Sequence, residues 1–292
     1  MDTIFRAAGP TTPDDLGLLK KLPGRWVGRG FNLIARPARQ GKKNKPPFFL
    51  ELNATHETLH FYLIGGDIPN RGQIEPTVVL HGVHYLQAVT DCATNTGIHK
   101  EPGLWIRVPK TAESSTETYV RQATIPHGDS LLAQSTLSTT VRSGPTIRPV
   151  NSLPFRGAIR GLNSNPSNPL GPPYTDPYRK SKLPAECLPK GLNAVKTIQD
   201  PTEVLRAGIQ GHTILETEVI AISTAPVGGI VNIPFVQKNA NAVRMDAIFW
   251  IETVRHKGTR KRYFQLQYVQ RVILDFDRIH WPHISVATLI KE

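Results

Sequence analysis

Residues 278–291, RIHWPHISVATLIK, decide the fold that we predict. The β-branched residues and the strict alternation of side chains favour a strand, because successive side chains leave a pleated backbone on opposite faces. One face carries His283, Ser285, Ala287 and Leu289, and the other carries Ile284, Val286, Thr288 and Ile290. A single imidazole, that of His283, therefore lies among small or apolar neighbours.

That imidazole has two interpretations. A neutral imidazole in an apolar cavity is what a haem iron needs as its protein ligand. A buried histidine that is only hydrogen-bonded to a neighbour, or one exposed at the end of the strand, would show the same local pattern. The rest of the chain has to decide between them.

Composition and charge limit the classes of function. The 292 residues are 39% hydrophobic and 20% charged, as in ordinary globular proteins, and the formal net charge of +12 favours anionic partners. Much of the excess charge lies in residues 36–45 and 255–262. Both segments lack interleaved aromatic residues on which bases could stack, so we do not expect nucleic-acid binding.

Two further features bear on location. Cys92 and Cys187 are too few and too far apart for a disulfide framework or a zinc site, which suits a reducing compartment. The first residues do not resemble a secretion signal, and no apolar run approaches the length of a membrane-spanning helix. We therefore expect a cytoplasmic protein without a membrane partner.

The chain predicts an all-β fold, namely an antiparallel up-and-down β-barrel. The predicted strands are residues 23–35, 48–53, 57–64, 78–90, 97–109, 120–125, 213–223, 244–254, 263–276 and 283–291. Several such strands with one apolar face and no long helix favour closure into a barrel that encloses a small ligand. A β-sandwich remains open, since alternation does not reveal closure.

Three segments complete the predicted organisation as a single domain. In the first strand Trp26, Gly28 and Gly30 share a face, and glycine inside a strand indicates sharp curvature or close approach to the backbone. Residues 1–22 are predicted to cap the barrel. Residues 143–211 are rich in Pro and Gly and form a long insertion, which we expect to cover Ile284, Val286 and Ile290.

Four motifs in order resemble the nitrobindin family of haem-binding β-barrels, which are related to fatty-acid-binding proteins. They are Gly24-x-Trp26-x-Gly28-x-Gly30, then Ile98-His99-x-Glu101-x-Gly103-x-Trp105-x-Arg107, then Pro126-His127-Gly128, and finally His283-x-x-x-Ala287-x-Leu289. The resemblance covers roughly residues 22–129 and 245–291. The long insertion is a departure from the compact family pattern.

The resemblance implies a b-type haem with His283 as its iron ligand and His99 on the other side of the pocket as the candidate catalytic residue. It also implies that Trp26, Gly28, Gly30 and Arg107 help to bind the cofactor. His84 is the second candidate for acid/base chemistry, and Arg25, Arg29 and Arg107 are candidates for binding the haem propionates.

The implied activity is on peroxide, nitric oxide or peroxynitrite, as a peroxidase or a peroxynitrite isomerase. The alternative is a non-enzymatic carrier or sensor for haem, nitric oxide or a hydrophobic anion, which would need His283 but no acid/base residue. A purely structural barrel would have a hydrogen-bonded His283 and no ligand-sized cavity. A homodimer is compatible with each of these hypotheses.

Overall fold

The computed structural model describes residues 10–38, 47–112, 114–184, 186–225 and 227–292. The first nine residues of the predicted cap lie outside the described residues, and so does most of the first basic segment.

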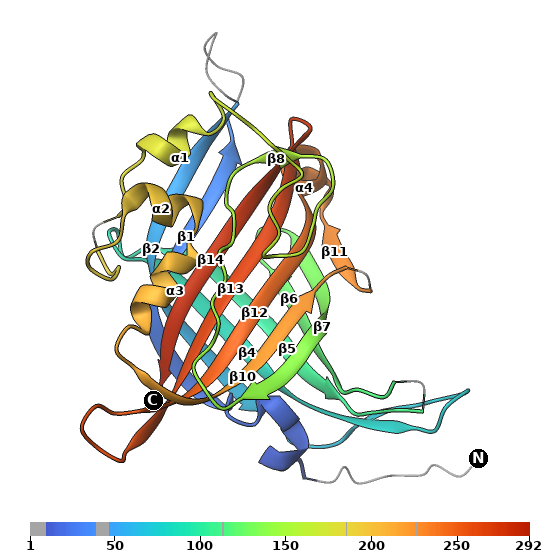
Figure 1. The fold of residues 1–292 in the computed structure, drawn as a ribbon. Coiled ribbons are helices and arrows are strands. Elements are labelled where there is room, and N and C mark those ends of the chain that lie inside the picture. The colour runs from blue at the N-terminus through green and yellow to red at the C-terminus, as the bar shows by residue number, and fades with distance from the viewer. Residues whose placement is uncertain (1–9, 39–46, 113, 185, 226) are drawn as a thin grey trace.

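Ten strands within the described ranges form a closed antiparallel ring (Figure 1). Each pairs with the next, and the last pairs with the first. In ring order they are β1 (Gly24–Pro37), β2 (Phe48–Leu63), β4 (Val78–Asp91), β5 (Gly97–Val108), β6 (Thr118–Ile125), β7 (Asp129–Val141), β10 (Thr213–Ser223), β12 (Asn241–Arg255), β13 (Arg262–Phe276) and β14 (Ile279–Lys291). The predicted all-β up-and-down barrel is confirmed, and the sandwich is excluded.

Two details of the strands differ from the prediction. The strands expected at 48–53 and 57–64 are one continuous strand, β2, and β7 was not predicted at all.

Four short strands join the ring without belonging to it: β3 (Ile68–Asn70) pairs with β4, β11 (Gly229–Asn232) pairs with β7, β8 (Phe155–Arg156) pairs with β14, and β9 (Asn168–Pro169) pairs with β8.

The seam between β1 and β14 explains the glycines of the first strand. Gly28 lies opposite Leu289 and Gly30 lies opposite Ala287. A Cβ atom at Gly28 would lie 2.0 Å from the carbonyl oxygen of Thr288, and one at Gly30 would lie 2.3 Å from a backbone oxygen on β14. The two strands therefore approach so closely that only glycine fits, which closes the ring.

One end of the barrel is plugged by a 3-10 helix, η1 (Pro13–Leu19), followed by a short loop. Leu16 and Leu19 are fully buried in the core of the barrel, and the indole Nε1 of Trp26 donates a hydrogen bond to the carbonyl oxygen of Leu22 at 2.7 Å. The described part of the predicted cap thus closes this end of the barrel. Any entrance to the interior of the barrel must be at the other end.

Residues 142–212 connect β7 to β10 and carry three short helices, α1 (Asp176–Lys180), α2 (Ala194–Gln199) and α3 (Thr202–Gly208). These helices lie against the outside of β1, β2 and β14 (Figure 1). Ile284 and Val286 are fully buried in the resulting second core, as expected from their outward apolar face. Ile290 is 37% exposed, so the expectation was wrong for this residue, which lies beyond the covered part of β14.

The insertion is fixed to the barrel by polar contacts and by a disulfide. Arg271 of β13 donates hydrogen bonds to the carbonyl oxygen of Arg160 at 2.7 Å and to Asp246 at 2.8 Å. Cys92, just after β4, is bonded to Cys187 of the insertion. The separation of the two cysteines in the sequence argued against a disulfide framework, but the insertion passes around β2 and brings residues 95 positions apart together.

Two findings concern location. No helix among the described residues is long and apolar enough to cross a membrane. The disulfide counts against the reducing compartment that we inferred, since disulfides persist mainly in oxidising environments. The cytoplasmic location stays a prediction.

Candidate functional site

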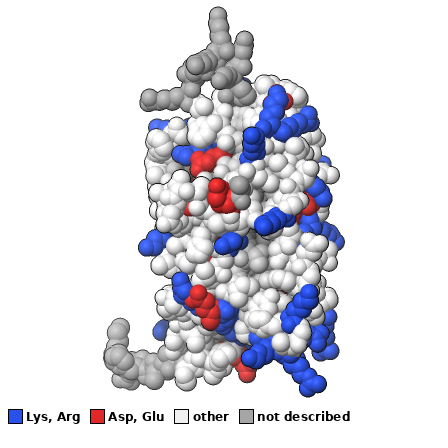
Figure 2. All heavy atoms as spheres, turned by 90° about the vertical axis from the view of Figure 1, so that its left-hand side faces the viewer, with Lys and Arg blue, Asp and Glu red and all other residues white. Residues whose placement is uncertain are grey.

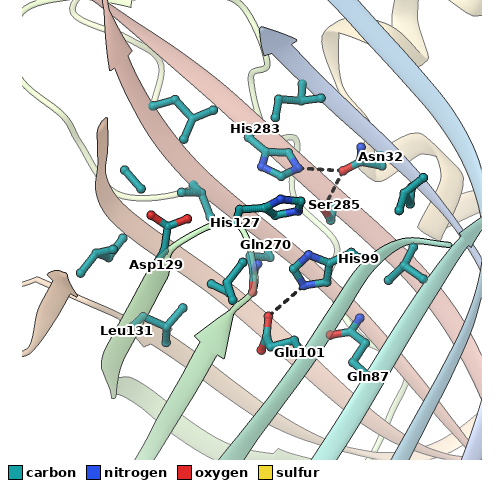
Figure 3. Close-up of a pocket in the computed structure, with 18 of the residues that line it drawn as sticks. Asn32, Gln87, His99, Glu101, His127, Asp129, Leu131, Gln270, His283 and Ser285 are labelled. Atoms are coloured by element: carbon teal, nitrogen blue, oxygen red, sulfur yellow. Dashed lines mark hydrogen bonds and ion pairs between the residues drawn. The ribbon is translucent and has the colours of Figure 1, made fainter. Parts of the chain in front are cut away.

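A cavity of about 570 Å³ occupies the half of the barrel opposite η1 (Figure 3). Its volume lies within the range of small-molecule pockets. Inward side chains of the strands form its walls, and Phe235 and Val236 of helix α4 (Pro234–Asn239) lie at its rim. The lining combines apolar residues such as Val89, Leu131 and Val272 with many polar and charged ones.

His283 projects into this cavity from β14, on the face that alternation predicted. Its Nε2 lies 2.8 Å from Oδ1 of Asn32, and the hydroxyl of Ser285 donates to the same oxygen at 3.0 Å. Asn32 stands opposite Ser285 in the pairing of β1 with β14, which is why the three side chains meet (Figure 3).

A chain of hydrogen bonds determines which nitrogen of His283 carries the proton. The carboxylate of Asp91 can only accept, and it accepts the side-chain amide of Asn53 at 3.0 Å. The oxygen of Asn53 then accepts the amide of Asn32 at 3.2 Å, so Oδ1 of Asn32 faces His283 as an acceptor. His283 therefore donates through Nε2–H, and its Nδ1 keeps a lone pair that meets no partner among the described residues.

His283 is electrically neutral at ordinary pH. Burial lowers the pKa of its imidazole to about 3, and the nearby His99 and His127 lower it further in the same direction. A neutral imidazole with one nitrogen held by an acceptor and the other free is the arrangement that metal-binding histidines generally have.

His99 lies on β5 and is held by a buried acidic group. Its Nε2 is 3.2 Å from Oε2 of Glu101, which is 1% exposed. Burial opposes the ionisation of Glu101, but the charge of Arg121 and the hydrogen bond from His99 lower its pKa to about 2. Arg121 donates to Oε1 of Glu101 at 2.5 Å and to Gln270 at 2.6 Å. Glu101 is thus an ionised anchor that orients His99.

A second carboxyl group, that of Glu57, lies deeper in the cavity. Burial raises the pKa of Glu57, although Tyr268, Thr55 and Gln87 oppose this shift by donating hydrogen bonds. The distances from Glu57 are 2.6 Å to the Tyr268 hydroxyl, 2.9 Å to Thr55 and 3.1 Å to Gln87. The floor of the cavity is therefore polar, and both oxygens of Glu57 accept hydrogen bonds.

His127 and Asp129 complete the site, and sequence reasoning did not single them out as site residues. His127 belongs to the turn between β6 and β7, and its ring centre lies 5.7 Å from that of His99. Burial, followed by the charge of His99, lowers the pKa of His127. Burial raises the pKa of Asp129, whose buried Oδ1 has no hydrogen-bond partner in the structure. The Pro126-His127-Gly128 motif was the available signal, but a turn has no periodicity that shows where its side chains point.

The other predicted site residues do not line the cavity. Trp26 is in the core near η1, Gly28 and Gly30 are at the β1–β14 seam, and Arg107 bonds the carbonyl oxygen of Asp15 at 2.7 Å beside η1. Arg29 is exposed on the outer face of β1, and Arg25 pairs with Glu292. His84 is exposed on the outside of β4, stacked on Tyr62 with 4.8 Å between ring centres.

No group of three or more His, Cys, Asp or Glu side chains in the described ranges is arranged to hold a metal ion. A site of that kind would bind a bare ion, whereas a porphyrin brings four of the ligands of its own iron.

Comparisons with known proteins find similarity to solved structures. No family model matches the chain, and no curated protein matches it. The chain is similar in structure to Rv2717c from M. tuberculosis, known from a crystal structure, with a TM-score of 0.45 and 12% sequence identity over 95% of this chain and 97% of that one.

Proposed function

We propose that the cavity binds haem b and that His283 is the protein ligand of its iron. The observation that carries this proposal is the state of His283: a neutral imidazole in a cavity of about 570 Å³, with Nε2 bonded to Asn32 and Nδ1 without a partner among the described residues. The resemblance to nitrobindins supports the same residue independently.

The distribution of charge in the cavity fits this cofactor. Inside, Arg121 is compensated by Glu101, and burial raises the pKa of Glu57, so the floor offers no free cation to a carboxylate. A ligand with acidic groups must keep them near the entrance, where Arg36 lies half-exposed. Haem has an apolar body and acidic groups along one edge, whereas a fatty acid would have to enter tail first.

Arg36 is therefore the arginine that we propose for the haem propionates, in place of Arg25, Arg29 and Arg107. It forms an ion pair with Glu51 at 2.9 Å, and its guanidinium lies over the ring of Phe49 at 5.5 Å. Both of these residues also line the cavity.

When bound through one histidine, haem supplies an iron centre that can react with peroxide or with nitrogen oxides. The chain's own contribution is to hold protons near that centre. His99 is held by Glu101 through Nε2, and burial lowers the pKa of His127, which favours its neutral form. Two imidazoles facing one cavity are suited to general acid/base catalysis.

The first experiment is a titration of the full chain with haemin, followed by its Soret absorbance. We expect one haem per chain and a loss of affinity of roughly tenfold to 100-fold or more in His283→Ala. His280→Ala is the matched control, since His280 lies on the same strand but bonds Asp275 and the backbone of Gly157 outside the barrel. Equal haemin binding by the His283 variant and the wild type would refute the proposal.

The second experiment separates an enzyme from a carrier. If His99 and His127 act as acid/base groups, His99→Gln and His127→Gln lower the rate of peroxide turnover by roughly 10²-fold to 10⁴-fold while haemin binding persists. A carrier or sensor would bind haemin without appreciable turnover in the wild type, and the two substitutions would change nothing that is measured.

A further inference from the structure

A second cavity lies at the closed end of the barrel, opposite the proposed haem site. It is a groove of about 840 Å³ that opens to solvent between the loop after η1 and the ends of β10, β12, β13 and β14. Its lining residues are Lys21, Arg142, Leu215, Glu216, Thr253, Arg262, Tyr263, Phe264, Lys291 and Glu292. The proposed haem chemistry uses none of them.

The acidic groups of this groove are already engaged. Lys21 forms ion pairs with Glu216 at 2.8 Å and with the buried Glu218 at 2.6 Å. Glu292 pairs with Arg25. The three carboxylates therefore form their ion pairs with Lys21 and Arg25 and none with the other cations of the groove, although Lys21 and, more weakly, the charge of Arg142 lower the pKa of Glu216.

Three cations remain in the groove. Arg142 and Arg262 form no ion pair or side-chain hydrogen bond in the described parts of the chain. The ammonium group of Lys291 donates to the carbonyl oxygen of Lys21 at 2.9 Å, and burial lowers its pKa. A partly buried ammonium that faces no carboxylate is costly, and an incoming anion would reduce that cost.

Aromatic rings form part of the wall. The ammonium group of Lys291 lies over the rings of Phe264, at 5.5 Å, and Trp26, at 5.7 Å. Tyr263 lines the same groove, with its ring centre 4.6 Å from that of His256. Tyr263 and Phe264, which line the groove, are partly exposed, whereas Trp26 is buried behind it. Cations beside partly exposed rings suit a planar aromatic ligand that also carries negative charge.

The positive electrostatic potential at this end of the molecule would attract such a ligand. The hairpin between β12 and β13 carries Arg255, Lys257, Arg260, Lys261 and Arg262. Figure 2 shows Lys and Arg side chains gathered at the lower end of the barrel, where Figure 1 places this hairpin. A surface with one sign of charge raises the local concentration of anions and their rate of association.

We propose that this groove binds a phosphorylated aromatic ligand of the nucleotide class. Arg142 and Arg262 would contact phosphate oxygens, since guanidinium groups bind them through paired hydrogen bonds, and Lys291 would supply the third positive charge. The aromatic part would lie against Tyr263 and Phe264. A concave groove of this volume matches a small ligand, whereas a nucleic-acid strand would need an extended track of aromatic residues.

Calorimetric titration of the full chain without haemin tests this assignment, with ATP, tripolyphosphate and a single-stranded oligonucleotide as probes. We expect ATP to bind, and the double variant Arg142→Gln/Arg262→Gln to weaken binding by roughly tenfold or more. Lys257→Gln/Arg260→Gln is the matched control, because it removes the same charge from the hairpin outside the groove. It should change the affinity for ATP by about threefold or less.

Three results would overturn the proposal. An equal loss in the control variant would mean that binding depends on overall charge and not on the groove. Equal affinity for ATP and tripolyphosphate would remove the role assigned to the rings. Much tighter binding of the oligonucleotide, abolished in the control variant, would make the hairpin a nucleic-acid surface. No haem signal enters these measurements, so their failure is distinct from that of the proposed haem site.

Discussion

The side-chain oxygen of Asn32 lies 2.8 Å from Nε2 of His283, although the two residues are 251 positions apart in the chain. Asn53 and Asp91 orient that oxygen through two further hydrogen bonds. Asp91 therefore determines the tautomer of His283 without contacting it. The proton of the ring is on Nε2, and the lone pair is on Nδ1.

Replacing Asn32 by Leu should disturb His283 without removing it. The imidazole would lose the acceptor that fixes its tautomer, and we expect haemin affinity to fall by roughly tenfold to 100-fold, as for other groups that orient metal ligands. Nitrogen NMR of the haem-free protein should show a mixture of His283 tautomers in place of one. Ser285→Ala is the control, since it removes only a second donor to the same oxygen. A single unchanged tautomer in Asn32→Leu would contradict the hydrogen-bond chain.

Glu101→Gln should destabilise the barrel strongly. The substitution leaves the guanidinium of Arg121 buried without its counter-charge, which costs about 3–5 kcal/mol. Urea denaturation at pH 7 measures the loss. Glu101→Gln/Arg121→Met removes both charges and should recover a large part of it, whereas additive losses in the double variant would show that the pair is not coupled.

Lowering the pH should remove the stabilisation that the Glu101–Arg121 ion pair provides. The pKa of Glu101 is about 2 in the folded state, against an ordinary value of 4.5. The folded state therefore binds fewer protons than the unfolded one between these values, so the stabilisation by Glu101 is complete above pH 4.5 and is lost as the pH falls toward 2. The difference between wild type and Glu101→Gln should shrink over that interval.

Glu252 predicts the opposite dependence on pH. Glu252 is fully buried on β12, Gln265 donates to its Oε2 at 2.5 Å, and its Oε1 has no hydrogen-bond partner among the residues that the structure describes. Burial raises its pKa to about 8, against the opposing effect of Gln265. The folded state then holds a proton that the unfolded state has released, and stability falls by up to about 1.4 kcal/mol per pH unit between pH 4.5 and 8.

Glu252→Gln should remove this loss, since a neutral amide of similar shape does not ionise. Urea unfolding at pH 6, 7, 8 and 9 would show a flatter profile in the variant than in the wild type, with the variant the more stable of the two at pH 9. Glu186→Gln, at an exposed position, should follow the wild-type curve. Parallel profiles for wild type and Glu252→Gln would show that Glu252 is already ionised at pH 6.

The Cys92–Cys187 disulfide closes a loop of nearly a hundred residues. Cys92→Ser/Cys187→Ser should lower the free energy of unfolding by roughly 2–5 kcal/mol, mainly because the unfolded chain regains freedom. Thermal unfolding with and without a reducing agent measures it: reduction should lower the wild type to the level of the variant and leave the variant unchanged. A thiol titration that finds two free cysteines in the unreduced protein would contradict the bond.

The strand period made part of the site predictable. Alternation around His283 placed it on the inner face of β14, and Gly28 and Gly30 indicated the close approach that closes the ring. Strand β7 escaped prediction because its serines and threonines hide any alternation between apolar and polar residues. A polar strand in the wall of a ligand cavity lacks the pattern that identifies a strand in a core.

The remaining features depend on the register between strands, which a single sequence does not reveal. Asn32 acquires its role because it pairs with Ser285 on one side and with Asn53 on the other. The disulfide depends on the path of the insertion around β2. The side chain of His127 enters the cavity from a turn, where neither the strand period nor the helix period of side-chain direction applies. Arg107 matches the family motif, but its side chain lies beside η1, where it donates a hydrogen bond to the backbone, and not in the cavity.

Closure of the ring by β1 and β14 has a consequence for biosynthesis. The earliest and the latest strand of the barrel form one seam, so the ring stays open until the ribosome has delivered β14. Until then β1 and β13 both present unpaired edges, which is when a β-rich chain is most prone to aggregate. His283 arrives with β14, so the proposed haem site cannot form before this strand has been synthesised.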